Sequence, residues 1–179
     1  MNYSYGTPRF KQWSGGSNSS YTCGNFCSIA SDVTIYLGGN HRTDWVTTYP
    51  FGHIHRHVFT RRMPGHPATR GDVIVGNDVW IADNVTIMSG VRIGDGAVIA
   101  CNSHDVRDVP PYSLVGGNPA KLIKYQFTQK QIEKLLTIKW WNWTEDKINE
   151  NIHLLCNNDI DKFIDKHYVN ENKHKCIIC

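Results

Sequence analysis

Aliphatic residues recur at every sixth position through the middle of the chain. A small or β-branched residue stands four positions after each of them. An amphipathic helix has a period of 3.6 residues and a half-buried strand a period of two, so neither element explains this spacing. A six-residue period is typical of a triangular solenoid, in which each hexad makes one short strand and one corner. The inward positions predicted for this parallel β-helix are Val75, Ile81, Ile87, Ile93 and Ile99.

The same register occurs earlier in the chain. Its inward positions there are Cys23, Ile29 and Ile35. Carried forward through Thr69, the pattern makes nine hexads, or about three coils, and it is irregular before Tyr21.

Two features depart from this repeat. Residues 41–68 interrupt the repeat and are expected to leave the helix as a loop. Asp105 occupies the next inward position, so the last coil is expected to open or distort there.

The pattern changes to a helical one after Lys124. Thr128 and Gln131 have the spacing of a capping box at the start of a first helix. A second helix is predicted to start at Thr144, and a third to span 163–168.

The predicted organisation has three parts. A β-helix domain spans 1–125 and carries the loop at 41–68. A small helical cap spans 126–169, and the polar tail at 170–179 is expected to be disordered.

Composition and charge exclude several classes of protein. The chain has 179 residues and a formal charge of +3, and its basic residues are scattered, so nucleic acid is not an expected partner. No apolar run is long enough to span a bilayer, and the first ten residues lack the apolar core of a signal peptide. A cytoplasmic location is therefore expected, with the six cysteines as reduced thiols.

Several short motifs occur in one order along the chain. They are 24–30 (Gly-Asn-Phe-Cys-Ser-Ile-Ala), 39–42 (Gly-Asn-His-Arg), 48–51 (Thr-Tyr-Pro-Phe), 76–81 (Gly-Asn-Asp-Val-Trp-Ile), 116–121 (Gly-Gly-Asn-Pro-Ala-Lys) and 140–143 (Trp-Trp-Asn-Trp). With them the sequence resembles the hexapeptide-repeat xenobiotic acetyltransferases. That family includes type B chloramphenicol acetyltransferases, streptogramin acetyltransferases and surface-sugar O-acetyltransferases.

The resemblance implies properties that the hexad spacing does not. It implies a left-handed coil, although ordinary crossover rules favour the right hand. It also implies a homotrimer with active sites in the clefts between subunits. The expected reaction is direct acetyl transfer from acetyl-CoA, without a covalent acyl-enzyme.

His41 matches the catalytic histidine of that family. Direct transfer to a hydroxyl needs a base that works near neutral pH, and histidine is suited to this task. His41 also lies where the repeat breaks and the loop departs, beside a rigid scaffold. Asp44 or a backbone carbonyl is expected to orient its imidazole.

By the same resemblance, the pantetheine arm of coenzyme A runs along the corners of successive coils. Trp80 is expected to wall this groove, and cations near the last coil are expected to bind the phosphates. The expected corner residues are Ala82, Asp83, Ala100 and Cys101, and the expected cations are Arg107, Lys121 and Lys124.

The acceptor site is expected in the loop at 41–68, where aromatic side chains stack on a sugar and polar groups bind its hydroxyls. The residues predicted to contact the acceptor are Asn40, Asp44, Tyr49 and Phe51. Alternating His53, His55 and His57 would share one face of an extended segment, as in a metal site. No cysteine or carboxylate cluster accompanies them, so a plain polar loop without metal is favoured.

Several functions stay open at this level. The leading hypothesis is acetylation of a hydroxyl, or an amine, on a sugar or sugar nucleotide for a surface glycan. The main alternative is inactivation of chloramphenicol or a streptogramin. A non-catalytic solenoid scaffold is a third class, which would not need a histidine at the loop junction. The sequence does not exclude a longer acyl donor.

Overall fold

The computed structural model describes residues 3–13 and 18–169. The predicted tail at 170–179 therefore lies outside the described residues. The chain divides into two compact units, Met1–Tyr125 and Gln126–Cys179. Each of these units has buried apolar residues of its own.

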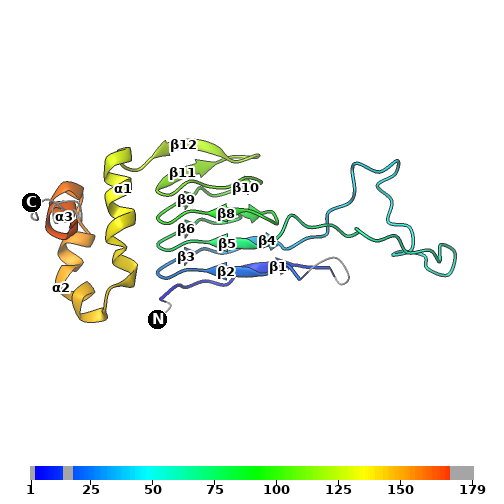
Figure 1. The fold of residues 1–179 in the computed structure, drawn as a ribbon, viewed down its shortest axis with the longest axis horizontal. Helices are drawn as coiled ribbons and strands as arrows, with labels where there is room; N and C mark the ends of the chain where they lie inside the picture. Colours follow the sequence, from blue (N-terminus) through cyan, green and yellow to red (C-terminus); the bar gives the residue numbers. More distant parts are fainter. Residues whose placement is uncertain (1–2, 14–17, 170–179) are drawn as a thin grey trace, which may run out of the picture. The chain divides into compact units, whose positions relative to one another are not determined.

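The first unit is a parallel β-helix made of short stacked strands (Figure 1). Its described strands form three sheets, with the orders β1-β4-β7-β10, β12-β11-β9-β6-β3 and β2-β5-β8. The strands are β1 (Arg9–Lys11), β2 (Tyr21–Cys23), β3 (Ser28–Ile29), β4 (Thr34–Tyr36), β5 (Val73–Val75), β6 (Trp80–Ile81), β7 (Thr86–Ile87), β8 (Arg92–Ile93), β9 (Val98–Ile99), β10 (His104–Asp105), β11 (Ser113–Gly116) and β12 (Lys121–Tyr125).

The hexad residues stack in register inside this helix. Ile29 pairs with Ile81, which pairs with Ile99 in the next coil. Val75 pairs with Ile93 in the same way. All five are buried, and fully burying a side chain of this size contributes about 1.5–3 kcal/mol relative to its exposed state. The six-residue spacing in the sequence is therefore the spacing of one side of the coil.

Asparagine and aspartate residues line the corners between strands. Asn84 and Asn102 both have a positive φ, which asparagine tolerates better than most residues. The Asn84 side-chain amide donates to the Asn102 Oδ1 at 2.8 Å, one coil later. Asn77 donates in the same way to the Asp95 carboxylate at 2.8 Å. Each of these two bonds ties a corner to the equivalent corner one coil later.

The β-helix begins earlier than the repeat in the sequence indicates. Strand β1 pairs in parallel with β4, and Tyr5 forms a bridge with Ser28. Phe10 lies in register with Ile35 and packs against Tyr21. It is 46% exposed because it ends the stack of described strands. This partial coil lacks the hexad pattern because, among the described residues, no further coil covers one side of it.

Asp105 keeps its inward position, and the coil shortens after it. Strand β10 pairs in parallel with β7, and Asp105 lies opposite Ile87 with its side chain buried. The next coil then pairs Val109 with Ile93, 16 residues earlier, where Ile99 follows its partner Ile81 by 18. The predicted distortion thus lies in the corner at 106–108, and the strand itself remains regular.

A long excursion leaves the β-helix between β4 and β5 (Figure 1). Its base is closed by two backbone hydrogen bonds between Asn40 and Ala68. The Asn40 N–H donates to the Ala68 carbonyl at 3.0 Å, and the Ala68 N–H donates back at 2.8 Å. The bridge therefore holds the two ends of the loop together at His41.

The second unit contains α1 (Gln129–Ile138), the short 3₁₀ helix η1 (Trp140–Asn142), α2 (Glu145–Leu155) and α3 (Ile160–His167). The capping box at Thr128 is formed, and Thr144 caps α2. Helix α3 begins earlier than predicted because the Asp159 side chain caps it. Within the described residues, none of the helices is both long and apolar enough to cross a bilayer.

Candidate active site

His41 lies at the base of the excursion and is held by one backbone hydrogen bond. Its Nδ1 lies 2.7 Å from the carbonyl oxygen of Thr48. A carbonyl oxygen only accepts, so Nδ1 carries the proton and donates it. The lone pair of the neutral ring is therefore on Nε2. His41 is exposed, so a solute can reach its ring.

The Thr48 carbonyl, and not Asp44, orients the imidazole. Asp44 accepts from Arg42 Nε at 2.7 Å, and a second Arg42 nitrogen contacts its other oxygen. This ion pair lowers the pKa of Asp44 to about 2. Of the two orienting groups that the sequence allowed, the structure therefore uses the backbone carbonyl.

A pocket of about 280 Å³ lies beside His41. Its lining residues come from the start of the chain and from the beginning, middle and end of the excursion. They are Trp13, Gly39, His41, Pro50, His53, Ile54, Arg56, His66 and Pro67. We call it the histidine pocket. Sequence reasoning did not place Trp13, Arg56 or His66 in it.

Three imidazole rings pack against one another in the histidine pocket. The ring centroid of His66 lies 4.7 Å from that of His41 and 4.8 Å from that of His53, edge to face in both pairs. Burial lowers the pKa of His66, and the neighbouring His41 and His53 lower it further. The His66 ring is therefore biased toward its neutral form.

Trp13 forms another wall of the pocket. Its ring stacks on Tyr36 of β4 with centroids 6.0 Å apart. It also covers Gly39, where a Cβ atom would lie 2.3 Å from the indole. Glycine at this position therefore lets the indole lie directly on the backbone. The glycine before Asn40 was the available signal, but its partner could not be identified from the sequence.

The residues predicted to bind coenzyme A lie on the β-helix. Trp80, 54% exposed on β6, is in register with Val98, then Leu114, then Lys124 of β12. Lys121 pairs with Gly116, two residues from Leu114. A bulge at Ile123 thus puts both lysines on the face that carries Trp80, although they are three residues apart.

The two predicted corners lie one coil apart, and the backbone amide of the alanine in each is already bonded. The Ala82 N–H donates to the Ile99 carbonyl at 3.0 Å, and the Ala100 N–H donates to the Val115 carbonyl at 2.9 Å. A pantetheine arm could therefore use only carbonyl groups at these two residues. Cys101 and Arg107 are exposed. The Asp83 carboxylate accepts from the Ser31 N–H at 2.9 Å.

Comparison with known proteins identifies the family. The bacterial transferase hexapeptide (six repeats) family model matches residues 72–104. A probable macrolide acetyltransferase of Lysinibacillus sphaericus is 47% identical over 140 residues, which cover 74% of each chain. The chain belongs to the hexapeptide-repeat acetyltransferases.

Two further relatives have the same activity but different acceptors in their names. A chloramphenicol acetyltransferase of Klebsiella aerogenes is 41% identical, over 76% of this chain and 66% of its own. A virginiamycin A acetyltransferase of Staphylococcus aureus is 46% identical, over 77% of this chain and 64% of its own. The acetyltransferase described here thus spans about two thirds of the length of these two relatives. Family membership also implies the left hand of its coil.

The four residues predicted to bind the acceptor do not line the histidine pocket of the acetyltransferase. Asn40 donates from its side chain to Ser89 Oγ at 3.3 Å and closes the loop with its backbone. Tyr49 and Phe51 pack with Phe59 in an aromatic cluster, with adjacent ring centroids 4.8 Å apart. Asp44 pairs with Arg42. Their contacts with an acceptor stay predictions.

The alternating histidines do not share one face. The segment that carries them is a series of turns, in which His53 packs on His66 while His55 packs on His57 at 6.2 Å. Among the residues that the structure describes, no three histidine, cysteine or acidic side chains are arranged to hold a metal ion.

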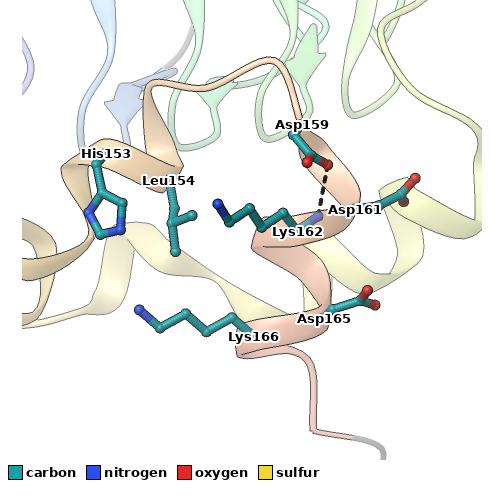
Figure 2. A pocket seen from close by; sticks show the side chains of 7 residues that line it. All are labelled: His153, Leu154, Asp159, Asp161, Lys162, Asp165 and Lys166. Carbon is teal, nitrogen blue, oxygen red and sulfur yellow. Dashed lines mark hydrogen bonds between the residues drawn. The ribbon is translucent and has the colours of Figure 1, made fainter.

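A larger pocket of about 580 Å³ occurs in the helical unit of the acetyltransferase (Figure 2). Its lining includes three aspartates and two lysines, and the Asp159 carboxylate accepts from the Lys162 backbone N–H at 3.1 Å. These charges offset one another, and His41 lies in the other unit. Size alone therefore does not identify the site of acetyl transfer.

Proposed function

We propose that this acetyltransferase moves an acetyl group from acetyl-CoA directly to a hydroxyl of a small acceptor, with His41 as general base. The observation that supports this role is the hydrogen bond from His41 Nδ1 to the Thr48 carbonyl. It orients the ring and leaves Nε2 able to accept a proton. Family membership supports the acetyl transfer itself.

The proposed reaction has two proton transfers. His41 Nε2 takes the proton of the acceptor hydroxyl as the oxygen attacks the thioester carbonyl carbon. The resulting tetrahedral intermediate collapses with cleavage of the carbon–sulfur bond. The imidazolium then returns the proton to the departing thiolate, so acetylated acceptor and free coenzyme A leave, and His41 is again neutral.

The donor site is proposed on the outer face of the five-stranded sheet. Trp80, Lys121 and Lys124 share this face by register. An exposed indole can cover the pantetheine arm, and the two ammonium groups can pair with the phosphates. By family resemblance, Arg107 adds a third cation, and the complete site lies in the cleft between subunits of a homotrimer.

For the acceptor we propose a sugar or sugar nucleotide. The histidine pocket offers an indole for stacking on a sugar ring, and imidazole and guanidinium groups for its oxygens. A second candidate is inactivation of an antibiotic. The relatives named for macrolide, chloramphenicol and virginiamycin acetylation favour it.

The test of this function is release of free coenzyme A from acetyl-CoA in the presence of one acceptor at a time. The acceptors are a set of sugars and sugar nucleotides, chloramphenicol, a streptogramin and a macrolide. Release that depends on a sugar supports the first proposal, and release that depends on an antibiotic supports the second. No release with any acceptor, and no acetyl-CoA binding by calorimetry, would favour a non-catalytic scaffold.

Replacing both Lys121 and Lys124 with alanine is expected to raise the KM for acetyl-CoA by about 10- to 100-fold, because two charge-assisted contacts to phosphate are lost. The kcat should change little. Steady-state kinetics of both donors check this, since S-acetyl-pantetheine lacks the nucleotide phosphates and should show no such change. The matched control is Lys11→Ala, on the edge of another sheet. An equal loss with both donors would contradict the assignment.

A further inference from the structure

The side chains that line the histidine pocket are basic without an acidic counterpart. His41, His53, His66 and Arg56 all line it. None of the described side chains that line the pocket is a carboxylate. The other described lining residues are one tryptophan, one isoleucine, one glycine and two prolines. These side chains can donate hydrogen bonds to a ligand, and none of them carries a negative charge. Oxyanions are the ligands that such groups bind best.

Two of these rings have buried nitrogen atoms that nothing in the described chain satisfies. His53 Nε2 and both ring nitrogens of His66 have no hydrogen-bond partner among the described residues. A neutral imidazole always has one N–H donor, so His66 has an unpaired donor in either tautomer. Buried polar groups in folded proteins are nearly always paired. Unpaired donors beside the base are therefore an arrangement that a ligand completes.

The groups around His66 are arranged so that binding of an anion would favour protonation of its ring. His41 and His53 face its ring at 4.7 and 4.8 Å, and Arg56 lines the same pocket. Arg42, whose guanidinium lies beside Gly65, is already paired with the Asp44 carboxylate. Burial lowers the pKa of His66, and His41 and His53 lower it further. An oxyanion between the rings would offset that repulsion and favour the protonated, doubly donating form.

We propose that the acceptor carries a phosphate or carboxylate group, which His53, His66 and Arg56 bind while His41 deprotonates a neighbouring hydroxyl. This inference rests on the proposed function and names the class of its acceptor. It separates acidic or phosphorylated sugars from neutral acceptors such as chloramphenicol. His66 and His53 are then specificity residues, because they contact the acceptor away from the reacting oxygen.

The first test compares matched acceptors that differ in one charged group. Coenzyme A release is followed with glucose, glucuronic acid and glucose 6-phosphate, and with N-acetylglucosamine and its 1-phosphate. The kcat/KM should be at least tenfold higher for the charged member of one series. The carboxylate and phosphate members distinguish the two anions. Equal or lower values for every charged member would overturn the inference but leave the proposed function intact.

Variants of His66 test the assignment to a residue. In His66→Phe, which keeps a ring but has no nitrogen, the preference for the charged acceptor should fall about tenfold. His66→Gln keeps a donor and should recover part of the preference. The matched control is His57→Gln, because His57 packs on His55 and is absent from the pocket lining. An unchanged preference in His66→Phe would overturn the role of His66.

A second measurement does not depend on turnover. The imidazole protons are titrated by NMR in the presence and absence of inorganic phosphate. Phosphate should move the titration midpoint of His66 upward by about one pH unit and leave that of His57 in place. If this occurs while no acceptor is acetylated, the anion site stands and the proposed function fails. If phosphate moves neither midpoint, the anion site is refuted even where a neutral acceptor reacts.

Discussion

Replacing His41 with alanine is expected to lower kcat by a factor of about 10²–10⁴, which is the usual contribution of a general base. The variant loses the group that accepts the hydroxyl proton, and no other described ring in the histidine pocket is oriented on a backbone carbonyl as His41 is on Thr48. The KM for acetyl-CoA should change little, since the proposed donor site lies on another face. Coenzyme A release with a saturating acceptor measures both constants.

Two controls separate catalysis from folding. His57→Ala removes an imidazole of the same loop outside the pocket, so it should keep most of the activity. The thermal transition of His41→Ala should match that of the parent protein, because the His41 side chain is exposed. A His41→Ala variant that keeps more than a tenth of kcat would disprove the assignment of His41 as the base.

Replacing Asp105 with valine is expected to stabilise the β-helix by about 1–3 kcal/mol at pH 7.5. The carboxyl group is 1% exposed in the stack of inward side chains, opposite Ile87. Its Oδ2 has no hydrogen-bond partner among the described residues, and burial raises the pKa of Asp105 to about 6. Valine has a similar size and needs no partner. Thermal unfolding should show a transition several degrees higher.

The pH dependence gives the sign of this effect. The folded protein holds the Asp105 proton up to a pH of about 6, whereas the unfolded chain loses it near 3.9. The contribution of Asp105 to the free energy of unfolding is therefore most favourable below about pH 4. The free energy of unfolding falls by at most about 3 kcal/mol as the pH rises from there through about 6. In Asp105→Val this part of the pH dependence should disappear. Asp105→Asn, which cannot ionise but stays polar, should lose the pH dependence with a smaller gain. If Asp105→Val is less stable than the parent protein at pH 7.5, the claim that the buried carboxylate destabilises the fold is wrong.

The prediction of the coil from sequence succeeded where one physical rule acts along the chain. Each side of the solenoid needs an inward aliphatic residue, so Ile81 and Ile99 repeat with the spacing of the coil. The rule no longer applies at the ends. Phe10 ends the stack of the described strands, where no further described coil covers it, and its segment carries no hexad.

The face of each β12 lysine was not predictable for a related reason. Residues three apart on a regular strand point to opposite faces. The bulge at Ile123 changes this parity and puts Lys121 and Lys124 on one side. A bulge depends on how two strands pair, and the sequence of the bulged strand alone does not determine that pairing.

The sequence by itself determined the repeat, the interruption at 41–68 and the position of His41, because these depend on local spacing and on motifs read along the chain. Only the tertiary structure decided which groups surround that base. The bridge between Asn40 and Ala68 brings the two ends of the loop together, which places His66 against His41. Trp13 joins them from the start of the chain. Such contacts depend on how distant segments close on one another, and hydrophobic periodicity carries no information about that.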